Sequence, residues 1–125
     1  MKKIAILLVL CSAVISCAPQ TRFVWGNYES SLYKYYKNPE QRETYRASLV
    51  QAVEKGSEVD KVAPGLLAEL GFLALEDGDK GQAVGYFERE MAIFPESQPF
   101  LQSVIKRAGA GEGSDDSTDD PDLVS

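Results

Sequence analysis

The chain contains no histidine, and its only cysteines are Cys11 and Cys17. Nucleophilic catalysis of the Ser–His or Cys–His type requires an imidazole base, so this chain excludes it. Zinc sites built from histidine and several cysteines are excluded for the same reason. Carboxylates alone could still catalyse glycoside hydrolysis, which uses two of them across a cleft.

Long apolar runs are also scarce. The longest, Ile4–Ile15, spans 12 residues and is interrupted by Cys11 and Ser12, whereas a membrane-spanning helix needs roughly 20. The run follows Lys2 and Lys3. A positive start and an apolar stretch of this length are typical of a secretory signal peptide. We therefore expect residues 1–16 to be removed.

The residues at the expected cut form a recognisable motif. Val14-Ile15-Ser16-Cys17 resembles the lipobox of bacterial lipoproteins, in which a small residue precedes an obligatory cysteine. The resemblance implies cleavage between Ser16 and Cys17, diacylglycerol on the Cys17 thiol and a further acyl chain such as palmitate on its amine. Two or more chains hold a protein firmly to a membrane. The alternative is an ordinary secreted or uncleaved segment.

The resemblance also bears on location and cofactors. In enterobacterial lipoproteins an Asp after the cysteine signals retention in the inner membrane, and here that residue is Ala18. The analogy implies an outer-membrane protein that faces the periplasm. Once Cys11 is removed, Cys17 has no disulfide partner. We expect no cofactor besides this covalent lipid.

Basic residues are too few for a nucleic-acid surface. Residues 17–108 carry 11 Lys and Arg against 13 Asp and Glu, whereas nucleic-acid binding requires clustered cations. Residues 109–125 hold six acidic residues and no basic one. Such a segment buries too little apolar surface to offset the entropy of ordering. We expect no nucleic-acid partner and a disordered acidic tail.

The mature chain shows helical spacing and no strand-like alternation. Its apolar side chains recur at three- and four-residue intervals. Caps and breakers predict about five helices in antiparallel pairs over residues 27–108, with a tether over 17–26. The helix starts are the caps Asn27, Asn38 before Pro39, and Ser97, together with Pro64 and the capping box of Asp79 with Gln82. The stops, in chain order, are Lys37, Gly56, Asp77, Pro95 and Gly109.

Residues 64–97 have the length of one tetratricopeptide repeat, 34 residues. They also resemble it in content, through Leu70-Gly71, Ala74, Gly78, Ala83, Phe87 and Pro95. The segment departs from the pattern at Leu67, where Trp is usual, and at Glu90, where a small residue is usual. The fold expected is all-α and tetratricopeptide-like, with an irregular five-helix bundle as the alternative.

A narrower resemblance spans residues 23–104. It rests on Trp25-Gly26-Asn27-Tyr28-Glu29, Pro64-Gly65-Leu66, Leu70-Gly71-Phe72 and Phe94-Pro95-Glu96-Ser97. These segments are similar to an uncharacterised family of Gram-negative lipoproteins, domain of unknown function 4810. Members are often encoded beside a lipoprotein resembling the curli secretion channel. The resemblance implies another envelope protein or lipoprotein as partner, and no assigned reaction.

Candidate binding residues follow from the repeat. In tetratricopeptide modules the first helix of each pair lines a concave groove, which by position implies Ala68, Phe72, Leu75 and Glu76. Packing in the core is an equally good explanation for the apolar members. Tyr33 is a candidate for contact with a membrane interface or a partner, although a position half buried against the second helix is the favoured alternative.

A calcium loop is the remaining candidate site. Asp77, Asp79 and Glu88 occupy positions 1, 3 and 12 of an EF-hand spacing. However, Gly81 offers no side-chain ligand at position 5, and Gln82 stands at position 6, where the loop needs glycine. A turn followed by a helix cap explains the segment, so we expect no metal.

Three functions are compatible with these patterns. The leading one is a lipid-anchored adaptor in an envelope complex, and the second is a structural lipoprotein without a specific groove partner. A carboxylate hydrolase is the remote third, and would require two acids facing each other across a cleft.

Overall fold

The computed structural model describes residues 21–110. The expected signal peptide, Cys17 and the expected acidic tail beyond Ala110 lie outside these residues. Within them the elements are α2 (Tyr28–Lys37), the 3₁₀ turn η2 (Pro39–Gln41), α3 (Arg42–Glu58), α4 (Leu66–Glu76), α5 (Lys80–Ile93), η3 (Pro95–Ser97) and α6 (Gln98–Ala110).

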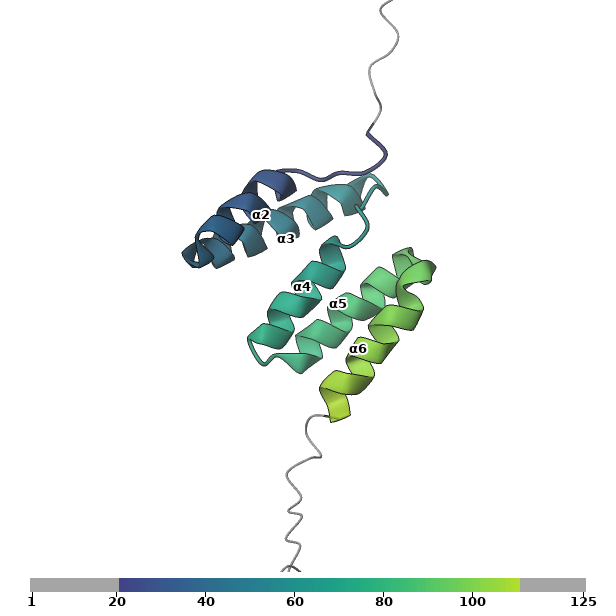
Figure 1. Cartoon of the computed structure of the whole chain (residues 1–125). Helices are drawn as coiled ribbons and strands as arrows, with labels where there is room; N and C mark the ends of the chain where they lie inside the picture. The colour runs from purple at the N-terminus through teal and green to yellow at the C-terminus, as the bar shows by residue number, and fades with distance from the viewer. Residues whose placement is uncertain (1–20, 111–125) are drawn as a thin grey trace, which may run out of the picture.

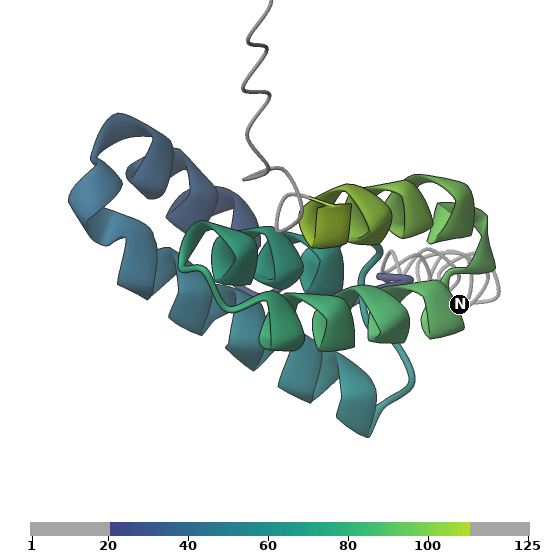
Figure 2. The same cartoon turned by 90° about the horizontal axis from the view of Figure 1, so that it is seen from below.

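The helices stack in chain order and form an all-α fold, as the sequence predicted. Each helix packs on the next, and the members of the pairs α2–α3 and α4–α5 run in opposite directions (Figure 1). Figure 2 shows two layers, with α2, α4 and α6 in one and α3 and α5 in the other. No helix within residues 21–110 has the length and apolarity of a transmembrane span.

Two of the expected N-caps are confirmed. Asn38 Oδ1 accepts the Glu40 N–H (3.1 Å), and Asp79 Oδ1 accepts the Gln82 N–H (2.9 Å). Each carboxylate or amide oxygen satisfies a donor that the first helical turn leaves unpaired. The second half of the Asp79 capping box is wrong, because the Asp79 N–H donates instead to the carbonyl of Ala74 (2.9 Å).

The other predicted caps are wrong. Asn27 makes no side-chain capping bond. The Ser97 hydroxyl donates to the Phe94 carbonyl (2.7 Å) instead of accepting from α6. At the far end, α6 continues through Gly109 to Ala110. Serine hydroxyls bond nearby carbonyls as readily as they cap helices, so the residue type alone did not decide the geometry.

Two helix ends differ from the predictions because of glycines. The second helix passes through Gly56 to Glu58, and a Cβ at Gly56 would lie 2.8 Å from Val62 Cα. This glycine therefore permits a close approach of the following loop and does not end the helix. The third helix begins at Leu66, not Pro64, because Gly65 precedes it with a φ of +90°.

The core consists of two connected clusters. One joins α3 and α4 through Tyr45 and Leu49 with the leucines of α4, and α2 packs on it. The other joins α4, α5 and α6 through Phe87 and Leu101. A Cβ on Gly71 would lie 2.4 Å from Phe87 Cε1. The absence of a side chain at Gly71 thus lets the Phe87 ring lie directly on α4.

The segment before α2 is bound to the domain at its end. The Val24 N–H donates to the carbonyl of Lys61 (2.8 Å), and the Phe23 ring meets Phe94 edge-on at 6.3 Å. Val24 and Val62 form an isolated parallel bridge. The expectation of a tether over the whole of 17–26 is therefore wrong at Phe23 and Val24, which pair with residues distant in sequence.

Candidate functional site

A groove of about 480 Å³ separates α4 from α6. From α4 it is lined by Phe72 and Leu75, and from α6 by Phe100, Val104 and Arg107. Phe72 is 36% exposed and Phe100 58%, with ring centroids 6.4 Å apart. Two neighbouring phenylalanines that solvent reaches provide an apolar contact surface beyond the scattered single residues of ordinary surfaces.

The four groove residues suggested by the repeat divide between different environments. Phe72 and Leu75 line the groove, whereas Ala68 is half buried and packs on the cluster of Phe87 and Leu101. Glu76 forms an ion pair with Arg42, the first residue of α3, at 3.3 Å. Phe100 and Arg107 were not singled out from the sequence, because Phe100 lies beside the apolar stripe of its helix and not within it.

The groove has one polar side. Arg107 donates from Nε to the Ser103 carbonyl and from Nη2 to the Ser103 hydroxyl, both at 3.2 Å. These bonds hold the guanidinium along α6, and guanidinium groups bind carboxylates with two parallel hydrogen bonds. The groove is therefore suited to an apolar segment that carries an acidic side chain or a chain-end carboxylate.

Tyr33 lies on the outward side of α2 and is 62% exposed. Its ring is 5.6 Å from the Lys37 ammonium. Half burial against the second helix, the favoured alternative, is therefore wrong, because most of the side chain is exposed to solvent. A shallow apolar depression of about 370 Å³ surrounds it, lined also by Tyr28, Leu32 and Tyr36.

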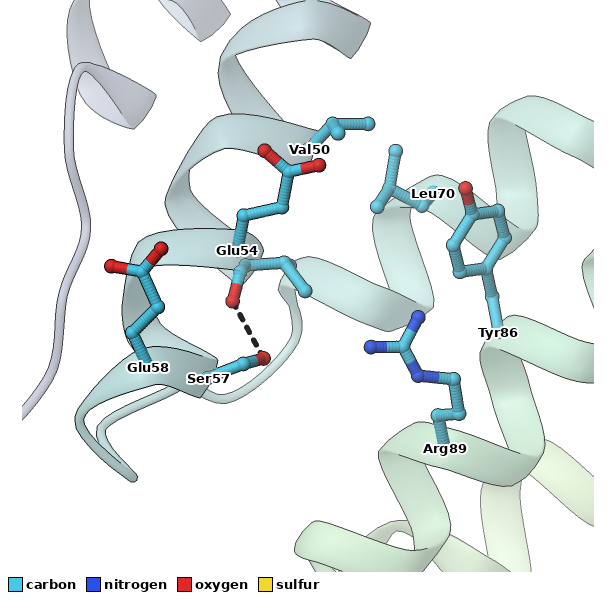
Figure 3. A pocket seen from close by; sticks show the side chains of 8 residues that line it. Val50, Glu54, Ser57, Glu58, Leu70, Tyr86 and Arg89 are labelled. Carbon is cyan, nitrogen blue, oxygen red and sulfur yellow. Dashed lines mark hydrogen bonds between the residues drawn. The ribbon is translucent and has the colours of Figure 1, made fainter.

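A second hollow, of about 520 Å³, lies between α3, α4 and α5 (Figure 3). Val53 and Leu70 are among its apolar lining residues, Glu54 and Glu58 line it from α3, and Arg89 lines it from α5. Both acids thus lie on one helix. This is not the pair of opposed carboxylates that a glycoside hydrolase requires.

The turn between α4 and α5 is held by ion pairs. Arg42 reaches Asp77 at 2.8 Å, and Arg46 bonds the other oxygen of the same carboxylate. Although burial opposes them, the two guanidinium groups hold the pKa of Asp77 below its usual value. Asp79 meanwhile caps α5. Both acids are used by the turn, and no group of metal-ligating side chains occurs within the described residues.

Glu90, the departure from the repeat pattern, is only 3% exposed. Its Oε1 accepts the Gly65 N–H at 2.6 Å, next to the start of α4. Burial raises the pKa of this carboxyl, and the N–H groups of Gly65, Ala68 and Leu67 oppose that shift in part. A carboxylate at a helix N-terminus is favoured by the helix dipole. Glu90 thus supplies the cap that the sequence around Pro64 lacks.

A buried polar cluster joins α2, α3 and α4. The Glu69 carboxylate accepts the Tyr45 hydroxyl at 2.8 Å and the Tyr28 hydroxyl at 3.2 Å. Burial, followed by the neighbouring Glu69, raises the pKa of both phenols, that of Tyr45 far more. Both hydroxyls therefore stay protonated and act as donors. The cluster fixes α2 in position and lies away from the groove.

The profile of one protein family, described as domain of unknown function (DUF4810), matches residues 23–104. The match begins at the phenylalanine that packs on Phe94 and extends into α6. No curated protein and no solved structure matches the chain. Because the matched range covers well over half of the 125 residues, this chain belongs to the DUF4810 family.

Proposed function

We propose that this chain is a membrane-anchored periplasmic lipoprotein that acts as a protein–protein adaptor in an envelope complex. Lipid on Cys17 holds it at the membrane, most simply the outer membrane, and the groove between α4 and α6 docks another envelope protein. The observation that carries the proposal is the pair of exposed rings, Phe72 and Phe100, on neighbouring helices of one layer.

The layered stack supports a tetratricopeptide-like interpretation. In such modules the first helices of successive pairs form the concave layer, which here corresponds to α2, α4 and α6 (Figure 2). Gly71 and Phe87 make the close contact within the central pair. Helical repeats use the concave surface for binding, and the groove of Phe72 and Phe100 lies between two helices of that layer.

Aromatic side chains at the centre of an interface supply much of the binding free energy. Phe100 is the cleaner probe, because Phe72 also packs edge-on against buried Phe87 at 5.2 Å. We expect Phe100→Ala to weaken partner binding roughly tenfold or more. Val59→Ala is the matched control, since Val59 is 53% exposed and lies outside the groove.

The test expresses the full chain and its variants in a Gram-negative host. Intact mass reports whether Cys17 carries lipid, and mild crosslinking followed by purification reports the partner. One partner that is retained by Val59→Ala and lost by Phe72→Ala and Phe100→Ala supports the adaptor. Lipidation without a specific partner would favour the structural lipoprotein instead. An unmodified Cys17 in the wild-type chain would contradict the proposed anchor. The Cys17→Ala chain, which cannot carry this lipid, is the control for the mass measurement.

A further inference from the structure

The helix α2 and the segment just before it carry large aromatic rings that are exposed to solvent. Trp25 is 39% exposed, Tyr33 62% and Tyr36 79%. Trp25 contacts Tyr28, with ring centroids 5.5 Å apart, and Tyr28 lines the same depression as Tyr33 and Tyr36. These three rings, Trp25, Tyr33 and Tyr36, are called the aromatic face below.

The exposure of this face does not follow from any need of the core. The inward side of α2 is completed by Tyr28, Leu32 and Tyr35, and Tyr35 stacks on buried Tyr45 at 5.2 Å. A helix that lies on a domain surface normally turns charged and polar side chains outward. The exposed rings are therefore not needed to complete the core, and they indicate a contact with something outside the domain.

Tryptophan and tyrosine are the side chains that suit a membrane–water interface, because the ring is apolar and the N–H or hydroxyl remains hydrated. Two charged groups border the face: the Lys37 ammonium lies 5.6 Å from the centre of the Tyr33 ring, and Glu29 lines the depression with Tyr33 and Tyr36. These two charges balance, so the aromatic rings themselves carry the argument for an interface.

The distance from the anchor favours the same partner. Phe23 is fixed against Phe94, and Val24 is bonded to Lys61. Only six residue steps separate Phe23 from Cys17, which span at most about 20 Å however they run. If Cys17 is lipidated as proposed above, this short connection holds Phe23 within that distance of the bilayer surface, and Trp25 is only two residues further along the chain.

We propose that the aromatic face of α2 rests on the phospholipid headgroup surface. This inference depends on the proposed lipid anchor and adds an orientation to it. The anchor keeps the domain at a high effective concentration beside the bilayer, so a weak aromatic contact suffices to hold α2 on the surface. The helices α2 and α6 lie at opposite ends of the stack (Figure 1), so a substitution on α6 leaves the aromatic face itself unchanged.

Trp25 is the only tryptophan of the chain, so its fluorescence reports on the aromatic face alone. The chain from Cys17 onward is coupled through its single thiol to a maleimide phospholipid. This makes the test independent of lipidation in cells. The product is inserted into vesicles of phosphatidylethanolamine and phosphatidylglycerol, with or without bromine on the upper acyl chain. We expect bromine to quench Trp25 strongly.

The double substitution Tyr33→Ser with Tyr36→Ser removes the contact while Trp25 remains. We expect it to reduce quenching roughly twofold or more, and Phe100→Ser, at the opposite end, to leave quenching unchanged. Trp25 that stays unquenched in the coupled wild type would overturn the proposal and assign the face to a protein partner. Equal quenching in wild type and the double variant would also overturn it, because the short connection alone would then explain the proximity.

Discussion

The two antiparallel pairs of this domain have the same architecture but different chemistry at their interfaces. In α4–α5 the helices meet through Gly71 and the buried ring of Phe87. In α2–α3 the Ser31 and Ser48 hydroxyls bond each other, and the Tyr28 hydroxyl reaches Glu69 on α4. One pair is held by apolar fit, and the other adds hydrogen bonds of hydroxyl groups to its aromatic packing.

This difference explains why the sequence of only one pair resembles a repeat. A tetratricopeptide pattern consists of small and large apolar residues at fixed positions, and the sequence of α4–α5 resembles it through residues such as Gly71 and Phe87. Serine and tyrosine contacts leave no such pattern, so α2–α3 has no recognisable repeat although it stacks in the same layers (Figure 2). The comparison predicts large effects of substitution in α4–α5 and smaller ones in α2–α3.

The largest effect is expected at Phe87. Its ring is fully buried between α4, α5 and α6, so Phe87→Ala should lower the free energy of unfolding by about 3–5 kcal/mol. Urea denaturation followed by circular dichroism measures this change. A loss below about 1 kcal/mol would mean that the pair does not depend on this apolar contact.

A methyl group at Gly71 tests the closeness of the same contact. Gly71→Ala brings a Cβ within 2.4 Å of the Phe87 ring, and overpacking should cost about 1–3 kcal/mol despite the better helix propensity of alanine. A double-mutant cycle with Phe87→Leu gives the control, because a smaller side chain should relieve the clash. Strictly additive free energies would contradict the predicted coupling.

The free energy of unfolding should be less sensitive to the loss of a single hydroxyl group in the contacts of α3. Tyr45→Phe keeps the stacked ring on Tyr35 and removes the hydroxyl that Glu69 accepts at 2.8 Å. We expect a loss of about 1–2 kcal/mol in thermal or urea unfolding. Exposed Tyr36→Phe removes a hydroxyl at the surface and serves as the control, with no measurable change. A cost at Tyr45 equal to that at Phe87 would erase the distinction between the pairs.

The smallest effect concerns pH. Since burial raises the pKa of Glu90, the folded chain holds this proton more tightly than the unfolded chain. The stability that protonated Glu90 contributes should be lost as the pH rises from the ordinary value of 4.5 through the raised one. Glu90→Gln should remove that decline, whereas exposed Glu88→Gln should keep it. Unfolding midpoints between pH 4 and 8 provide the comparison; a parallel pH dependence in wild type and Glu90→Gln would contradict it.

Local rules predicted the parts of the fold that depend on neighbouring residues. Helix boundaries were predicted correctly at Asn38 before Pro39 and at the Asp77–Asp79 turn, because a cap and its donors lie within four residues of each other. The same rules predicted a wrong helix end at Gly56. The helix α3 passes through this residue, and the missing side chain makes room for Val62. Spacing along α4 likewise placed Glu76 beside Phe72, although a salt bridge to Arg42 holds its carboxylate at α3.

Contacts between distant residues accounted for most of what the sequence did not reveal. Glu90 caps α4 from 25 residues away, and Val24 pairs with a loop that follows α3. In the candidate site, Phe72 and Leu75 could be proposed because the repeat fixes their positions. Phe100 and Arg107 could not, because their side of the groove exists only once α6 packs beside the repeat.

The most direct test of the adaptor is photo-crosslinking from the groove in living Gram-negative cells. A photoreactive phenylalanine analogue replaces Phe100 in one chain and Val59 in another, so that two exposed apolar positions are compared. The proposed function predicts one specific crosslinked protein from position 100, none from position 59, and loss of that product on Phe72→Ala. The same products from both positions, or none from position 100, would contradict a docking groove between α4 and α6.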